Sequence, residues 1–328
     1  MILVCGGAGY IGSHTVSELI KKGEDVVVVD NLETGHIDAV NEKAKFYKID
    51  IRNKEDLDKV FKENNITEVI HFAANSLVGE SMTNPLKYFN NNVHGTEVLL
   101  QVMVDNNVDK IVFSSTAATY GEAKEMPITE ETKTNPTNAY GETKLAMEKM
   151  MKWCDTAYKT KYVSLRYFNV AGANESGYIG EDHTPETHLI PLILQVPLGK
   201  REFISIFGED YDTEDGTCIR DYIHVVDLAK AHILAIEYLR KGNKSNIFNL
   251  GNGSGFSVKE MIDAARKVTN HEIPAKICER RAGDPARLIA SSEKAKSILN
   301  WIPEYTNVED IIASAWNWHK NNPNGFNK

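Results

Sequence analysis

Short runs of β-branched residues alternate with helix-like segments along the first half of the chain, and this alternation strongly constrains the fold. The run Val26–Val29 contains no polar residue, which is typical of a strand covered on both faces. Strands are expected at 2–5, 26–30, 46–50, 69–73, 110–115 and 162–169, and helices at 13–22, 54–64, 85–106 and 138–159. This repetition predicts an α/β fold with a Rossmann-type, doubly wound parallel sheet.

The regular alternation ends near residue 169. We expect residues 1–168 to form the Rossmann domain and residues 169–328 to form a smaller mixed α/β lobe. The segment 221–250, which includes a strand at 247–250, is expected to pack back onto the first sheet. Further helices are expected at 188–198, 257–269 and 308–320, and Ser257 and Glu260 have the spacing of a capping box.

Composition excludes several classes of function. A net charge of −9 disfavours binding to nucleic acid and to an anionic membrane surface. No apolar run approaches 18 residues and the start of the chain does not resemble a signal peptide, so a cytoplasmic protein without a membrane span is expected. The scattered cysteines contain no C-x-x-C pair, which fits a reducing compartment. They are Cys5, Cys154, Cys218 and Cys278.

A glycine-rich turn, Gly6 to Gly12, follows the first expected strand. Glycines at 6, 9 and 12 let the backbone approach a pyrophosphate at a helix N-terminus, although such a turn is also a common way to leave a strand. Asp30 ends the next strand, 18 residues after Gly12, where a carboxylate can accept from both hydroxyls of a ribose. Because that carboxylate would repel a 2′-phosphate, NAD is predicted rather than NADP.

Tyr140 and Lys144 are four residues apart in an expected helix, so they lie on one face. The ammonium group is expected to favour the phenolate and to lower the tyrosine's pKa toward the range of a working base. The first helical turn, capped by the segment 135–138, adds positive potential. Beside a nicotinamide, such a pair can take a proton from an alcohol, so redox chemistry at a carbinol carbon is predicted.

Two further features bear on this pair. Thr116 ends a strand at the carboxyl edge of the sheet, where its hydroxyl can relay or orient a proton between a substrate and Tyr140. The alternative is a threonine that only satisfies the backbone. A second Tyr-x-x-x-Lys pattern, Tyr120 and Lys124, lies in a loop where no helix holds the pair on one face. Tyr120 is therefore expected to be a packed loop residue.

Motifs along nearly the whole chain resemble the UDP-glucose 4-epimerase family of extended short-chain dehydrogenases/reductases. They lie at 6–14 (GGAGYIGSH), 30–32 (DNL), 50–52 (DIR), 166–169 (RYFN), 216–225 (GTCIRDYIHV) and 280–284 (RRAGD). The resemblance implies an isomerase of galactose metabolism that reversibly inverts C4 of a UDP-hexose, UDP-galactose to UDP-glucose. The route is a transient 4-keto sugar with enzyme-bound NADH. It also implies a homodimer packed through the helices around 85–106 and 138–159.

The resemblance also implies the residues of the site, without a metal. The catalytic residues are Thr116, Tyr140 and Lys144. The cofactor contacts are Gly6, Gly9, Tyr10, Ile11, Gly12, Asp30, Asn31, Leu32, Thr34, Gly35, Asp50, Ile51, Phe72, Ala73, Ala74, Asn92, Tyr140, Lys144 and Phe168. The substrate contacts are Thr116, Tyr140, Asn169, Leu189, Phe207, Arg220, Arg281, Asp284 and Leu288. Two arginines suit a pyrophosphate because their forks bind oxygens bidentately. An ion pair with Asp221 or another carboxylate is the alternative for Arg220.

Three positions depart from the family pattern. Thr116 stands where many members have serine, and Ser76 stands where some carry a cofactor-contacting lysine. Leu288 occupies a position that borders the C2 substituent of the sugar, where other members have tyrosine or cysteine. Because leucine is smaller than tyrosine, an N-acetyl group could fit there. A related epimerase or decarboxylase that acts on UDP-N-acetylhexosamine or UDP-glucuronate stays open as the alternative, since recognition of a carboxylate is not readable from the sequence.

Other activities are disfavoured by particular residues. Nucleotide-sugar 4,6-dehydratases carry Asp-Glu directly after the catalytic threonine, whereas Ala117 and Ala118 stand here and have no proton to move. A cofactor-sensing regulator with a dead active site has no need for the three catalytic residues together. A metal site from Glu181, Asp182, His183 and His188 is disfavoured because this loop lacks helical two-histidine spacing.

Overall fold

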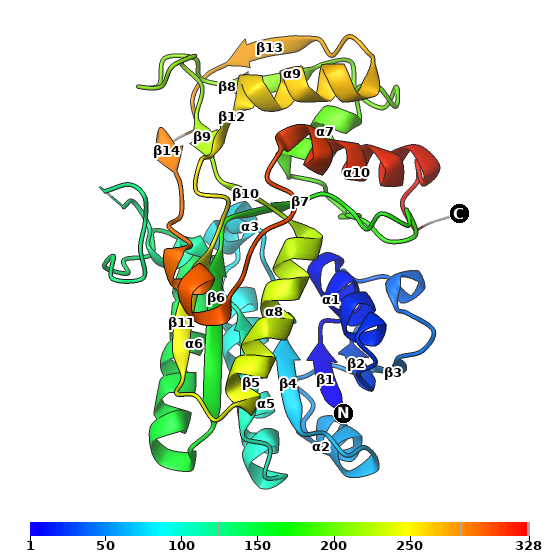
Figure 1. The fold of residues 1–328 in the computed structure, drawn as a ribbon, viewed down its shortest axis with the longest axis vertical. Helices are drawn as coiled ribbons and strands as arrows, with labels where there is room; N and C mark the ends of the chain where they lie inside the picture. Colours follow the sequence, from blue (N-terminus) through cyan, green and yellow to red (C-terminus); the bar gives the residue numbers. More distant parts are fainter. Residues whose placement is uncertain (124, 282–283, 327–328) are drawn as a thin grey trace.

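A seven-stranded parallel sheet forms the centre of the computed structural model, which describes residues 1–123, 125–281 and 284–326 (Figure 1). The strand order is β11-β6-β5-β4-β1-β2-β3, and every neighbouring pair is parallel. The strands are β1 (Ile2–Cys5), β2 (Val26–Asp30), β3 (Lys45–Lys48), β4 (Glu68–His71), β5 (Lys110–Ser114), β6 (Lys161–Tyr167) and β11 (Asn246–Leu250). The predicted doubly wound α/β fold is confirmed.

Helices cover both faces of this sheet. One core contains side chains of α1 (Tyr10–Lys21) and α8 (Val225–Arg240), and the other contains side chains of α2 (Lys54–Glu63), α5 (Gly95–Asp105) and α6 (Ala139–Tyr158). Val26 and Val28 belong to the first core, whereas Val27 and Val29 belong to the second. The unbroken valine run thus reflects a strand buried on both faces, as predicted.

The order of the strands reverses beside β1, which pairs with β2 on one side and with β4 on the other. At such a switch point the connections leave toward opposite faces, so a crevice opens at the carboxyl ends of the strands. The loops after β1, β2 and β4 therefore start at neighbouring positions along one edge of the sheet.

The second half of the chain adds a third core, formed by side chains of α7 (Leu189–Leu194), α9 (Val258–Thr269) and α10 (Val308–Asn321), together with strand residues. Figure 1 shows these helices beyond the carboxyl end of the large sheet. Short strands accompany them: β7 (Asn169–Ala171), β8 (Ile204–Phe207), β9 (Ile219–Arg220), β10 (Tyr222–His224), β12 (Phe256–Ser257), β13 (Ala275–Cys278) and β14 (Arg287–Leu288). In the large sheet, β11 pairs with β6, while α8 lies against α1. The division at residue 168 stays a prediction.

Local signals place several helix ends, and one helix begins earlier than expected. The Ser257–Glu260 capping box forms, and the Asn138 side chain caps α6 by accepting from the backbone N–H of Gly141 at 2.8 Å. Helix α1 begins at Tyr10 rather than at residue 13, so Gly12 lies inside it. A Cβ on Gly12 would meet the carbonyl oxygen of Gly6 at 2.1 Å, so glycine lets the helix start against the turn.

The expected helix over 85–106 is not continuous. It consists of α4 (Pro85–Tyr88), a π-helical stretch (Phe89–His94) and α5, and it follows α3 (Val78–Thr83). The π-helical stretch contains Asn92, whose buried amide donates to the hydroxyl of Thr143 in α6 and to the backbone carbonyl of Asn75. This stretch is therefore tied both to α6 and to the loop that follows β4.

Candidate active site

The parallel strands bring most of the predicted cofactor residues to one edge of the sheet. Each loop at that edge follows the carboxyl end of a strand, where doubly wound sheets bind ligands. The segments are Gly6–Gly12 after β1, Asp30–Gly35 from the last residue of β2 onward, Asp50 and Ile51 after β3, Phe72–Ala74 after β4, Thr116 after β5, and Phe168 after β6. Residues that are far apart in the sequence are thus brought to one edge of the sheet.

Asp30 is fixed beside the glycine turn by backbone donors. One carboxylate oxygen accepts from the N–H of Ala8 at 3.0 Å and the other accepts from the N–H of Leu32 at 2.9 Å. Burial raises the pKa of the Asp30 carboxyl, while the hydrogen bonds from Leu32 and Ala8 oppose this effect. Leu32 has a φ of 60°, a left-handed conformation that is rare for such a side chain and that clusters at functional sites.

Asp50 holds the loop after β3 against the loop after β2. Its carboxylate accepts from the guanidinium of Arg52 at 2.9 and 2.6 Å and from the amide of Asn31 at 3.3 Å. The hydrogen bonds from Arg52 lower the pKa of Asp50 to about 2. This carboxylate is therefore charged at neutral pH, and its direct contact with a cofactor stays a prediction.

Thr116, Tyr140 and Lys144 come together where α6 packs against the loop after β5. A Cβ on Gly141 would lie 2.5 Å from the carbonyl oxygen of Ala118, so glycine permits this close approach. The Thr116 hydroxyl accepts from the N–H of Ala118 at 3.1 Å, so it caps the backbone. It also lies near enough to Tyr140 to lower the pKa of the phenol, so the proposed role beside the tyrosine stays a prediction.

The pKa shifts of the pair differ from the expectation. Burial raises the pKa of Tyr140 to about 12, although the nearby hydroxyl of Thr116 acts to lower it. Burial also lowers the pKa of Lys144 to about 7. The ammonium donates to the carbonyl oxygen of Ser114 at 2.7 Å and lies 5.9 Å from the centre of the tyrosine ring. The expected lowering of the tyrosine's pKa is therefore wrong for this structure, because desolvation dominates.

These residues fit a bound dinucleotide. The Lys144 side chain is 3% exposed, and its ammonium makes one hydrogen bond within the described parts of the chain. Since an ammonium has three donors, two can still reach ribose hydroxyls. The glycine turn and the buried Asp30 carboxylate lie along the same edge of the sheet. There the turn can bind the pyrophosphate of the dinucleotide, and the carboxylate can bind its second ribose.

The predicted substrate residues of the second lobe form a separate group. The Arg281 guanidinium lies 4.0 Å from the centre of the Phe207 ring, and Arg220 pairs with Asp284 at 3.2 Å. Leu288 in β14 lies opposite Arg220 in β9. Of the motif at 280–284, residues 282 and 283 lie outside the described residues. Asn169 and Leu189 begin β7 and α7.

Asp221 has a structural role that the sequence did not indicate. Its buried carboxylate accepts from the N–H groups of Asn252, Gly253 and Ala290 at 2.6, 3.1 and 3.0 Å. It therefore joins three segments of the second lobe. Of the alternative for Arg220, the ion pair with Asp221 does not occur, whereas an ion pair with another carboxylate does: the partner is Asp284, which belongs to the predicted substrate group.

Tyr120 is a packed loop residue, as predicted. It is 1% exposed, and its hydroxyl donates to the side-chain oxygen of Asn249 at 2.7 Å. Lys124, its partner in the second Tyr-x-x-x-Lys pattern, lies outside the described residues. The Arg166 guanidinium lies 4.8 Å from the centre of the Tyr120 ring.

The buried partner of that arginine, Glu148, was not predicted from the sequence. Glu148 accepts from Arg166 at 2.9 and 2.5 Å and from the hydroxyl of Ser115 at 2.5 Å. Glu148 follows Tyr140 and Lys144 at four-residue spacing, so it lies on the same face of α6. A glutamate on an inward helical face is the signal that could have identified this contact.

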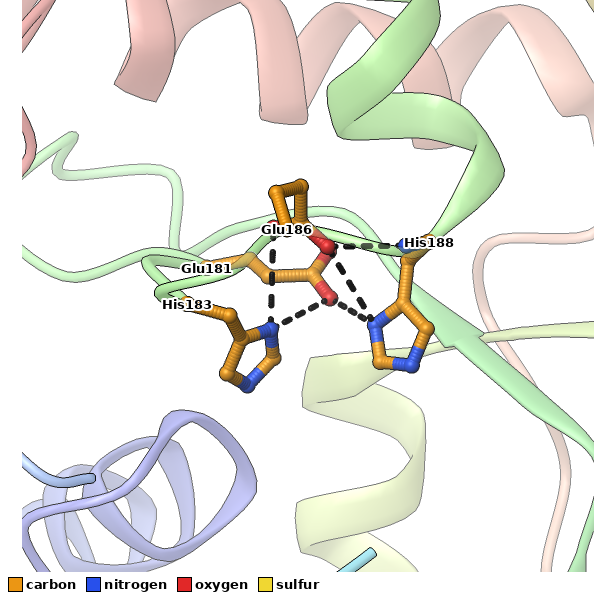
Figure 2. Close-up of side chains that lie close together, drawn as sticks. All are labelled: Glu181, His183, Glu186 and His188. Carbon is orange, nitrogen blue, oxygen red and sulfur yellow. Dashed lines mark hydrogen bonds and ion pairs between the residues drawn. The ribbon is translucent and has the colours of Figure 1, made fainter. Parts of the chain in front are cut away.

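The loop before α7 gathers a group of side chains for which the sequence disfavoured a metal site. Figure 2 shows Glu181, His183, Glu186 and His188 converging, and one ligand-type atom from each lies within 4.8 Å of the others. Asp182, which was expected in this group, instead accepts from the N–H of Phe326 at 2.9 Å. The missed member is Glu186. The sequence argued against a cluster because the two histidines lack helical spacing. The turns of the loop nevertheless bring these side chains together.

Comparisons with known proteins agree with this geometry. A family model described as the NAD dependent epimerase/dehydratase family matches residues 2–251. The UDP-glucose 4-epimerase of Halalkalibacterium halodurans is 61% identical over 99% of this chain and 97% of its own, and that of Lacticaseibacillus casei is 60% identical over 99% and 98%.

Solved structures are also similar to this chain. The crystal structure of a UDP-glucose 4-epimerase, 63% identical, has a TM-score of 0.99 and covers 100% of this chain and 99% of its own. A UDP-glucose 4-epimerase from Bifidobacterium longum in complex with NAD+ and UDP is 44% identical, with a TM-score of 0.93 over 99% of both chains.

Proposed function

The chain belongs to the NAD dependent epimerase/dehydratase family, and from this premise we propose that it interconverts UDP-galactose and UDP-glucose by inverting C4. The observation that carries the proposal is the placement of Thr116, Tyr140 and the buried Lys144 where α6 packs against the loop after β5, at the carboxyl edge of the sheet. Relatives named UDP-glucose 4-epimerase match over 99% of this chain.

Each residue of the trio has a distinct task. Tyr140, as the phenolate, removes the proton of the C4 hydroxyl and returns it after inversion. Burial favours the neutral phenol, and the positive charge of a bound NAD⁺ would oppose that effect. Thr116 orients the substrate oxygen toward the tyrosine, and Lys144 holds ribose hydroxyls through its remaining donors. The chemistry that NAD supplies when bound is reversible acceptance of a hydride from C4 of the hexose. The half-buried position of Tyr140 limits the access of water to this step.

The second lobe anchors the nucleotide. Arg220 and Arg281 are suited to the diphosphate because guanidinium forks bind its oxygens bidentately, and Asp284 can accept from a ribose hydroxyl. Inversion at C4 requires the hexose to rotate so that it presents its opposite face between the two proton transfers. The protein must therefore bind UDP tightly and the hexose weakly. Phe207, beneath Arg281, adds an apolar surface to this anchor.

The activity is tested with purified protein, UDP-galactose and no added cofactor. We expect UDP-glucose to accumulate to an equilibrium mixture, measured by NMR or chromatography, because no net oxidation occurs. Failure to form UDP-glucose, even when NAD is supplied, would contradict the proposal. A permanently oxidised sugar with stoichiometric consumption of coenzyme, or a 4-keto-6-deoxy product, would also contradict it.

A parallel assay with UDP-N-acetylgalactosamine and UDP-glucuronate tests the other sugars. Leu288 lies next to Arg220 across the β9–β14 pair. We expect Leu288→Tyr to reduce turnover of the N-acetylated sugar relative to UDP-galactose, because the larger ring would fill the space near C2. Equal effects on both substrates would show that Leu288 does not border that substituent.

Asp30 is expected to set the preference for NAD. Removing its charge with Asp30→Asn should weaken NAD binding by about 10- to 100-fold, the effect of losing a charged hydrogen bond. Discrimination against NADP should fall as well, because the repulsion of a 2′-phosphate is lost. Binding is measured by titrating cofactor-stripped protein, with the exposed Asp38→Asn as the control. Unchanged NAD affinity in Asp30→Asn would contradict the assignment.

We also propose that the protein is a homodimer. Large apolar side chains stay exposed on α4 and α6, which lie side by side: Leu86 is 79% exposed and Trp153 is 69% exposed. Large apolar side chains that stay exposed on neighbouring helices suit a protein–protein contact. Light scattering should give a dimer for the wild type and a monomer for Leu86→Glu/Trp153→Glu. Tyr178→Glu, 83% exposed in the loop before α7, is the matched control.

We place this activity in galactose metabolism in the cytoplasm. The four cysteines are free, which suits a reducing compartment. No helix within residues 1–123, 125–281 and 284–326 combines the length and apolarity needed to cross a membrane. Cell fractionation that recovers the protein with secreted material would contradict this placement.

A further inference from the structure

The loop between β7 and α7 closes on itself so that four side chains point at one spot (Figure 2). Two are imidazoles, from His183 and His188, and two are carboxylates, from Glu181 and Glu186. The Glu181 side chain is 4% exposed and the Glu186 side chain is 9% exposed, whereas those of His183 and His188 are 30% and 51% exposed. The group therefore has a buried carboxylate floor and an open histidine side through which an ion can enter.

The spacing of the donor atoms matches a small coordination sphere. Nδ1 of His183 lies 3.4 Å from a Glu181 oxygen and 3.6 Å from a Glu186 oxygen, and Nδ1 of His188 lies 4.0 Å from the other Glu186 oxygen. Bonds of about 2.1 Å to a tetrahedral Zn²⁺ separate its ligands by about 3.4 Å. Glu181 and His188, which are in direct contact, need to separate slightly.

The charges of the group suit a divalent cation. The two carboxylates bring two negative charges to a largely buried spot, and one divalent cation neutralises both when the two imidazoles are neutral ligands. Two imidazoles with two carboxylates form a donor set that Zn²⁺ and related transition metals accept.

We propose that Glu181, His183, Glu186 and His188 form a binding site for one divalent transition-metal ion, Zn²⁺ in the first instance. The site fastens a loop that touches three parts of the molecule. The His183 ring packs edge-on against Tyr10 of α1, at 6.2 Å between centres, and the carbonyl oxygen of Glu181 accepts from the Trp318 indole of α10 at 3.2 Å. His188 directly precedes the first residue of α7. The ion has a structural role, and it does not contact the catalytic residues Thr116, Tyr140 and Lys144.

The test uses the full chain with its cofactor, freed of metal by a chelator. Calorimetric titration with Zn²⁺ should show one site per chain, and Co²⁺ should give the visible absorption of a tetrahedral complex without a thiolate charge-transfer band. Zn²⁺ should also raise the thermal midpoint by several degrees, because it binds the folded state. His183→Ala/His188→Ala should weaken Zn²⁺ binding at least 100-fold and abolish the thermal shift.

Three further variants distinguish binding at these four side chains from binding elsewhere on the protein. Glu186→Gln keeps a side chain of the same shape, so the loop should stay folded. Weaker Zn²⁺ binding by this variant would therefore reflect the lost carboxylate ligand and not misfolding. His94→Ala removes an exposed histidine that faces Glu97 at 3.0 Å, and it should bind Zn²⁺ like the wild type. Cys154→Ser/Cys278→Ser should also bind normally. No saturable binding to the wild type, or equal binding in the double-histidine variant, would overturn the proposal and leave an ion-pair network.

Discussion

Replacing Tyr140 by phenylalanine is expected to lower kcat for C4 inversion by about 10²- to 10⁴-fold, the usual contribution of a positioned acid–base group. The substitution removes one oxygen and leaves the ring, the helix cap at Asn138 and the buried Lys144 in place. NAD should therefore stay bound and the fold should persist. Initial rates with UDP-galactose, together with the bound NAD per chain, measure both effects.

Tyr120→Phe is the matched control, because Tyr120 starts the other Tyr-x-x-x-Lys pattern. Its hydroxyl donates to Asn249 inside the protein, so its loss should cost about 1–3 kcal/mol of unfolding free energy and leave kcat within a few-fold of the wild type. Full activity in Tyr140→Phe would remove the tyrosine from the mechanism. A loss of activity confined to Tyr120→Phe would mean that the two patterns had been assigned the wrong way round.

Glu148→Gln is expected to lower the free energy of unfolding by about 3–5 kcal/mol, because it leaves the Arg166 guanidinium without its buried counter-charge. Both side chains of this pair are 5% exposed, so water cannot replace the carboxylate. The effect extends to the site, since Glu148 also accepts from Ser115, the neighbour of Thr116. Urea unfolding at neutral pH measures the change through the shift of the midpoint.

The control for this prediction is a pair of the same kind on the surface. Glu293 and Lys296 form an ion pair at 2.9 Å with side chains that are 78% and 43% exposed, so Glu293→Gln should change stability by less than about 1 kcal/mol. Equal effects of the two substitutions would contradict the importance of burial. A loss of kcat in Glu148→Gln without a loss of stability would instead give Glu148 a positioning role in the reaction.

Much of the fold could be predicted because its signals are local. The valine run of β2, the Asn138 cap and the Ser257–Glu260 box each depend on residues close in sequence and on a repeating backbone geometry. The parallel sheet then places the ends of its strands at one edge, so Asp30 and Thr116 could be assigned to a shared crevice. The resemblance to a known family supplied the residues of the second lobe, whose short strands have no strong periodicity.

The sequence by itself determined the strand–helix alternation, the glycine turn and the four-residue spacing of Tyr140 and Lys144, because short-range sterics and helical periodicity act within a few residues. Only the tertiary structure decided the burial that moves the pKa of both residues, the pairing of Arg220 with Asp284, and the closure of the loop around Glu181. Desolvation and contacts between distant segments depend on every neighbour in space, and no local pattern encodes those neighbours.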